Sequence, residues 1–151
     1  MQALLTLLLL LPLAANAANS LRGTWQSDRD ATMRFVREHA VLETNQTEFL
    51  DGSLGQLKLS FDSLKMHYQM PDVDVTIQGK PQHFVGSDDA YSYRVLGADQ
   101  DSVAVMLKGI LGRDRIWHIH FVNHDMFWLY SEESDYGLRN LNFREYFRRI
   151  E

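Results

Sequence analysis

The chain has 151 residues, with 20 acidic and 15 basic side chains and a formal net charge of −5. This acidic balance argues against nucleic acid and anionic membrane surfaces as partners, because both require a basic surface. The chain has no cysteine, which excludes thiol catalysis and disulfide crosslinks.

The N-terminal segment reads MQALLTLLLLLPLAANA over residues 1–17. An apolar run that ends in small-x-small, here Ala15-Asn16-Ala17, predicts a secretory signal peptide cleaved near Ala17. The run is shorter than the ~20 residues that span a bilayer, so we expect no membrane span. The remaining residues 18–151 suffice for one domain. We therefore expect an exported protein, periplasmic or secreted, and the lack of cysteine favours a bacterial periplasm.

One helix is expected near the start of this domain. Ser27 followed by Asp30 resembles a capping box and predicts a helix from about Asp28 to His39. The next segment, residues 42–55, is polar and is broken by Asp51-Gly52. It predicts a loop.

The rest of the domain carries short segments in which apolar and polar residues alternate. These segments lie near residues 57–61, 66–70, 73–77, 91–95, 103–107, 115–130 and 143–150. Alternation of this kind predicts strands, and the short turns between them leave no room for the crossover helices of a parallel sheet. The sequence therefore predicts a mainly β fold: an antiparallel meander closed into a barrel of about eight strands, with one short N-terminal α-helix.

The segment Arg115–Tyr130, RIWHIHFVNHDMFWLY, predicts a β-hairpin with two possible registers. With a two-residue loop at Asn123-His124, one face carries Trp117, Ile119, Phe121, Met126, Trp128 and Tyr130. The other face then carries His118, His120, Phe127 and Leu129. A three-residue loop shifts the pairing by one and places the two histidines beside Trp128 and Tyr130. Such loops favour glycine, which is missing here, so the two-residue loop is expected.

Aromatic residues across the predicted strands have the character of an apolar pocket with polar handles. This candidate ligand-binding set comprises Tyr68, Tyr91, Tyr93, Trp117, Phe121, Trp128 and Tyr130. The same residues also suit a packed core, since an eight-stranded barrel is just wide enough to be filled or to hold one small ligand.

His118 and His120 lie two apart on a strand and present two imidazoles on one face. A third metal ligand would have to come from His67, His83 or Glu145, and a catalytic zinc site requires three. We therefore predict no cofactor and keep a transition-metal site at these histidines as an alternative. Four arginines near the C-terminus, Arg139, Arg144, Arg148 and Arg149, suit an outward face with one barrel-closing contact or an anion site. No hydrolase, phosphate-loop or zinc-protease motif is present, so no catalytic residue is nominated.

Two short motifs carry a resemblance to a family. Gly23-Thr24-Trp25 near the predicted mature N-terminus, with Arg148-Arg149 on the last predicted strand, resembles the lipocalin-like, or calycin, barrels. The chain resembles small exported bacterial members of undefined function. The resemblance implies that the tryptophan packs across the barrel base beneath an arginine of the final strand, a cation–π contact.

The functional expectation is a non-enzymatic binding protein for a small apolar molecule or a partner protein. Two alternatives remain. One is a metal-binding protein or metal-dependent enzyme that uses His118 and His120. The other is an envelope interaction module with a filled barrel, which predicts an exposed apolar patch.

Overall fold

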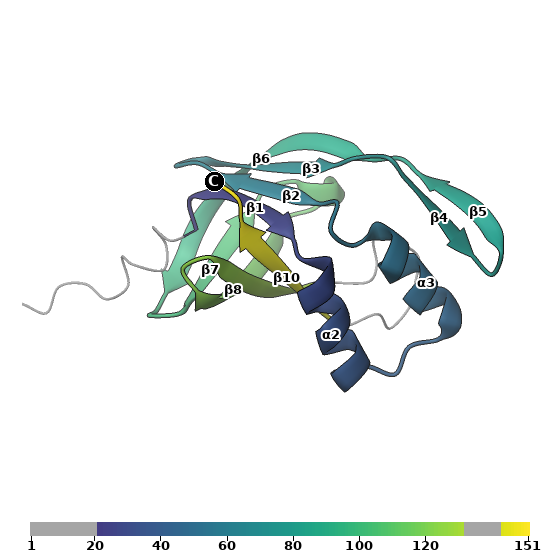
Figure 1. The fold of residues 1–151 in the computed structure, drawn as a ribbon. Helices are drawn as coiled ribbons and strands as arrows, with labels where there is room; N and C mark the ends of the chain where they lie inside the picture. The colour runs from purple at the N-terminus through teal and green to yellow at the C-terminus, as the bar shows by residue number, and fades with distance from the viewer. Residues whose placement is uncertain (1–20, 132–142) are drawn as a thin grey trace, which may run out of the picture.

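The computed structural model describes residues 21–131 and 143–151. The predicted signal peptide and Arg139 lie outside these residues. Eight antiparallel strands form a closed barrel in the order β1-β10-β9-β8-β7-β6-β3-β2 (Figure 1). Their bounds are β1 Gly23–Ser27, β2 Lys58–Phe61, β3 Lys65–Met70, β6 Ser87–Ala98, β7 Ser102–Leu107, β8 Arg115–Asn123, β9 Met126–Ser131 and β10 Phe143–Arg149. The predicted eight-stranded barrel is confirmed.

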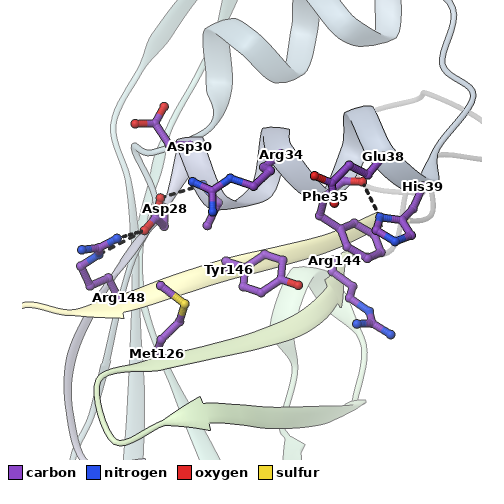
Figure 2. A pocket seen from close by; sticks show the side chains of 11 residues that line it. Asp28, Asp30, Arg34, Phe35, Glu38, His39, Met126, Arg144, Tyr146 and Arg148 are labelled. Atoms are coloured by element: carbon purple, nitrogen blue, oxygen red, sulfur yellow. Dashed lines mark hydrogen bonds and ion pairs between the residues drawn. The ribbon is translucent and has the colours of Figure 1, made fainter.

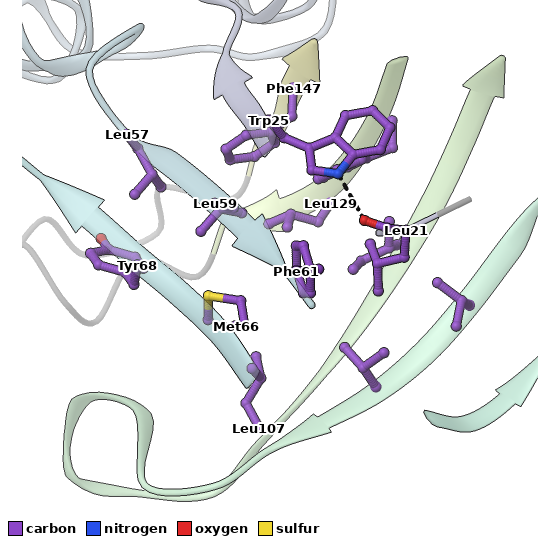
Figure 3. Close-up of a cluster of buried hydrophobic side chains, with 14 of the residues drawn as sticks. Leu21, Trp25, Leu57, Leu59, Phe61, Met66, Tyr68, Leu107, Leu129 and Phe147 are labelled. Carbon is purple, nitrogen blue, oxygen red and sulfur yellow. Dashed lines mark hydrogen bonds between the residues drawn. The ribbon is translucent and has the colours of Figure 1, made fainter. Parts of the chain in front are cut away.

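Alternation along the strands builds the core of the barrel. In β7, Val103, Val105 and Leu107 are buried while the residues between them are more exposed. The buried apolar side chains of this cluster are Leu21, Trp25, Leu57, Leu59, Phe61, Met66, Tyr68, Val103, Val105, Leu107, Ile110, Ile119, Phe127, Leu129 and Phe147 (Figure 3). Burial of this apolar surface is the main stabilising contribution to the fold.

A two-stranded sheet interrupts the meander between β3 and β6. It consists of β4 (Val73–Ile77) and β5 (Lys80–Phe84), and it projects from the barrel as an arm (Figure 1). The sequence did not predict β5, because nearly all of its residues are exposed and the segment has no alternation of apolar and polar residues. The arm is held by a helix: the rings of Phe84 on β5 and Phe49 on α3 (Thr44–Ser53) lie 5.1 Å apart.

The loop predicted for residues 42–55 is wrong, because α3 occupies most of it. Gln46 caps its first turn by accepting a hydrogen bond from the Glu43 backbone N–H, 2.9 Å long. Phe49 and Leu50 are buried and anchor the helix. Gly52 does not break it but permits close packing, since a Cβ there would lie 2.7 Å from a methyl carbon of Val75.

The first helix, α2 (Arg29–His39), lies where it was expected, but its cap differs from the prediction. Asp28 is the N-cap, and its carboxylate accepts a hydrogen bond from the Ala31 N–H at 3.0 Å. Ser27 belongs to β1 and points into the protein, so its hydroxyl is not free to cap the helix. A single turn of 3-10 helix, η1 (Ile110–Gly112), joins β7 to β8.

The register favoured for the β8–β9 hairpin is wrong. His120 pairs with Trp128, Phe121 with Phe127 and Asn123 with Met126, with a bulge between Phe121 and Asn123. The loop is therefore His124-Asp125, and the residue added by the bulge shifts β9 by one. A bulge of this kind reverses the face of every later side chain, and the alternation of either strand does not reveal it. Phe127 and Leu129 consequently face the core.

Candidate functional site

Three of the predicted barrel-closing residues, Gly23, Trp25 and Arg149, meet at one end of the barrel. Trp25 is fully buried, and its indole N–H donates to the Leu21 carbonyl at 2.9 Å. The guanidinium carbon of Arg149 lies 4.1 Å from the centre of the Trp25 ring. Gly23 has a positive φ of 125°, and a Cβ there would lie 2.6 Å from the Glu151 carbonyl oxygen, so no larger residue fits.

The other predicted arginine of this pair points away from the tryptophan. Arg148 lies on the outer face of β10, where its guanidinium pairs with the Asp28 carboxylate at 2.6 Å. The pair joins the last strand to the N-terminus of α2. Arg149 alone therefore makes the cation–π contact that the resemblance implied.

The structure divides the predicted aromatic ligand-binding set between two faces of the barrel. Tyr68 is buried in the core, and four others pack against the core while remaining partly exposed: Tyr91, Tyr93, Trp117 and Phe121. Trp128 and Tyr130 lie on the outer face instead, because of the bulge. Their predicted place inside the barrel is wrong.

On the outer face, side chains of β8, β9, β10 and α2 form one continuous stack. The His120 ring lies 4.2 Å from the Trp128 ring at an interplanar angle of 11°. The Arg144 guanidinium covers Trp128 at 4.0 Å and Phe35 of α2 at 5.0 Å. The stack extends to His39, whose ring lies 4.5 Å from that of Phe35.

Arg144 is the cation at the centre of this stack. Within the described part of the chain no carboxylate pairs with it, and its buried Nε–H has no acceptor. Burial lowers the pKa of Arg144, while the nearby hydroxyls of Tyr130 and Tyr146 raise it, so that the pKa lies above its ordinary value. The guanidinium is therefore charged and partly desolvated.

Beside this cation runs a groove of about 470 Å³ between α2 and β10 (Figure 2). Its lining combines apolar side chains with three acidic side chains and three arginines. The lining residues are Asp28, Asp30, Ala31, Arg34, Phe35, Glu38, His39, Met126, Arg144, Tyr146 and Arg148. A lining that combines aromatic and charged side chains suits a polypeptide segment better than a purely apolar molecule.

The neighbouring outer surface of β8 and β9 is also exposed. Ile116 and Val122 on β8 are each 53% exposed, and Tyr130 on β9 is 55% exposed. None of the described residues covers them. We call the set Phe35, Ile116, His120, Val122, Trp128, Tyr130 and Arg144 the aromatic–arginine face.

The two candidate metal ligands lie on this side of the sheet. His118 is exposed, and burial lowers the pKa of the partly buried His120. Glu145 is on the inner face of β10 and His83 pairs with Asp74 on the arm, so neither extends the pair. Among residues 21–131 and 143–151, no group of three potential ligands is placed to hold a metal ion. Metal binding by these histidines stays a prediction.

Glu145 is a buried carboxyl group whose environment the sequence did not indicate. It is 8% exposed, and the Ser27 hydroxyl donates to its Oε1 at 2.7 Å. Ser27 in turn accepts from the Gly55 N–H at 3.1 Å, which ties the end of α3 to the barrel. Burial raises the pKa of Glu145 to about 7, against the smaller effect of the Ser27 hydrogen bond. Glu145 lies two residues before Phe147 on the same strand, so their side chains share a face. This spacing could have predicted that Glu145 faces inward with Phe147.

Comparison with known proteins gives no relative: no family model, no curated protein and no solved structure matches the chain. In the described residues, no helix is both long enough and apolar enough to cross a membrane.

Proposed function

We propose that this chain is a non-enzymatic binding protein that recognises a partner protein through the aromatic–arginine face. The observation that carries the proposal is the position of Trp128, Tyr130 and Arg144 on the outside of the barrel. Tryptophan, tyrosine and arginine are the residues that most often dominate the free energy of protein–protein binding. Their stacking also fixes their orientations before a partner arrives, which lowers the entropic cost of binding.

The surroundings of these three residues support a protein as the ligand. Ile116 and Val122 add exposed apolar surface, and exposed apolar patches on a folded domain are typical of interaction sites. The α2 groove adds charged groups at the border, as in the polar rim of an interface. The buried side chains of the core cluster meanwhile pack against one another within the barrel.

The proposal also includes the localisation of the protein and its family. The apolar run that ends at Ala17 supports export to the periplasm or secretion, where the partner would be an envelope protein. The barrel order and the contact between Trp25 and Arg149 support a place among the lipocalin-like barrels. A shared fold alone does not give a function.

Quantitative co-purification from the cells that make the protein tests this function. A variant with Trp128→Ala and Tyr130→Ala should lose the proteins that co-purify with the unaltered chain. The control is Leu64→Ala, which removes a more exposed apolar side chain, 72% exposed against 55% for Tyr130, from a turn outside the face. If both variants retain the same proteins as the unaltered chain, the proposed interface is wrong.

A small apolar ligand inside the barrel is a second candidate function. It is favoured by Tyr91, Trp117 and Phe121, which face inward yet keep part of their surface exposed. Native mass spectrometry of protein purified from its own host tests this function. A bound small molecule would support the carrier function, and the bare protein mass alone would refute it.

A further inference from the structure

The surroundings of Arg144 differ from those of Arg29, Arg148 and Arg149. Arg29 pairs with Asp51 at 2.5 Å and Arg148 with Asp28 at 2.6 Å, while Arg149 lies 3.7 Å from Asp125. Arg144 is more enclosed than Arg148 and pairs with no carboxylate among the described residues. A charge removed from water without a counter-charge is unfavourable, and arginine cannot lose its proton to avoid this.

Rings cover the flat faces of the guanidinium, so its remaining recognition capacity lies at its edge. Trp128 and Phe35 lie 4.0 and 5.0 Å from its central carbon, and Tyr130 lies at 5.8 Å. Planar N–H groups at the edge match the two oxygens of a carboxylate, and adjacent rings strengthen such a pair by limiting its contact with water. The hydroxyl oxygens of Tyr130 and Tyr146 accept hydrogen bonds from the guanidinium, and their own O–H groups can donate to a carboxylate close to this edge.

We propose that Arg144 is the receptor for a carboxylate of the partner protein, presented by an acidic side chain in a segment that lies in the α2 groove. This inference rests on the proposed function and names the chemistry of the partner at the same face. Phe35, Tyr146 and Met126 form the apolar part of the groove, where an aliphatic side chain beside the acidic residue would pack. The recognised feature is one acidic residue flanked by apolar residues.

The charges along the groove set the preference for a single acidic residue. Asp28, Asp30 and Glu38 line the same groove as the arginines. A run of several acidic residues would be repelled by these carboxylates and by the net charge of −5. One carboxylate seated at Arg144, with apolar neighbours, avoids that repulsion.

Side-chain NMR of the mature chain tests this inference with two matched peptides. The probe is an acetylated, amidated peptide with one central glutamate between leucines, and its twin carries glutamine instead. The Glu peptide should shift the Arg144 Nε–H resonance and the Gln peptide should leave it in place. Equal shifts with both peptides, or none with the Glu peptide, would overturn the inference. This comparison uses the unaltered chain and so stands even if a variant fails to fold.

Two variants and a small anion sharpen the test. Arg144→Gln should weaken binding of the Glu peptide about tenfold or more, as expected for loss of a charge-assisted pair. Arg37→Gln, which changes an exposed arginine of α2 outside the groove lining, should leave it unchanged. If acetate shifts the resonance as strongly as the peptide at equal concentration, Arg144 is a simple anion site and the partner-protein assignment fails.

Failure of this inference is distinguishable from failure of the proposed function. If the Glu peptide does not bind but Trp128→Ala with Tyr130→Ala still abolishes co-purification, the face is an interface and only the role of Arg144 is wrong. If co-purification is unaffected as well, both proposals are wrong.

Discussion

Arg144 and Glu145 are neighbours in β10, yet they lie on opposite faces of the barrel wall, and neither has an opposite charge beside it among the described residues. Glu145 faces inward, where it can bind a proton and become neutral, as its pKa of about 7 indicates. Arg144 faces outward and keeps its charge at any physiological pH. The fold therefore allows the inner carboxyl group to become neutral, whereas the outer guanidinium stays charged. We therefore propose that the inner face serves stability and the outer face serves recognition.

The largest difference between the two faces is expected from their tryptophans. Trp25→Ala should lower the free energy of unfolding by about 3–5 kcal/mol, because a fully buried ring leaves a cavity in the core. Trp128→Ala should cost less than about 2 kcal/mol, because its ring is partly exposed and stacks only on neighbouring surface groups. Urea unfolding at neutral pH measures both. Equal losses would remove the distinction between the faces.

Glu145→Gln should make stability less dependent on pH. The pKa is about 7 in the folded chain and near 4.5 when the group is unperturbed, so the unfolded state loses its proton first as the pH rises. The free energy of unfolding of the unaltered chain should therefore fall between pH 4.5 and 7, by about 3 kcal/mol, and stay low above pH 7.

In Glu145→Gln that fall should be absent, and the variant should be the more stable protein at pH 8. Urea unfolding at several pH values measures this. Glu38→Gln, at an exposed acid of α2, should retain the slope of the unaltered chain. If Glu145→Gln leaves the pH dependence of the free energy of unfolding unchanged, ionisation of Glu145 does not destabilise the fold.

Arg149→Met tests the other cation–π contact of β10, which belongs to the fold. Its loss should lower the free energy of unfolding by about 2 kcal/mol, since Arg149 covers Trp25 and donates to the carbonyls of Arg22 and His124. Thermal unfolding measures the change. Arg37→Met, at an exposed site of α2, should stay within about 0.5 kcal/mol of the unaltered chain. If the two variants match, Arg149 does not stabilise the barrel.

The smallest effect on stability is expected from Tyr130→Ala. This side chain is 55% exposed, so the free energy of unfolding should change by no more than about 0.5 kcal/mol. Co-purification of the partner should nevertheless fall, because the face loses one of its aromatic groups. Calorimetry and quantitative mass spectrometry give the two values. A large loss of stability would place Tyr130 with the structural residues.

The sequence allowed most of the barrel to be predicted and little of the site. Alternation at Val103, Val105 and Leu107 reports burial directly, so β7 was found. The bulge after Phe121 leaves no such pattern, because each strand of the hairpin alternates normally on its own. Because the bulge was not predicted, Trp128 and Tyr130 were placed in the core, whereas they lie on the outer face. The pattern of any single strand therefore could not predict the stack of His120, Trp128, Arg144 and Phe35.

The roles of Arg144 and Glu145 depend on contacts between distant parts of the chain. Phe35 lies on α2, and only the packing of that helix on β10 brings its ring to Arg144. Ser27 was assigned to a helix cap, whereas pairing of β1 with β10 turns its hydroxyl toward Glu145. Local propensity does not encode either contact. The arginine cluster was predicted, but not which of its members has no carboxylate partner among residues 21–131 and 143–151.

Ile116 and Trp117 provide the most direct test of the central claim, because they are adjacent in β8 and face outward and inward respectively. A photo-crosslinking amino acid at each position, introduced in the cells that make the protein, would report which face meets a ligand. We expect a discrete protein adduct from position 116 that disappears with Arg144→Gln, and no such adduct from position 117. A small-molecule adduct at position 117, with none at position 116, would contradict the account and favour a carrier.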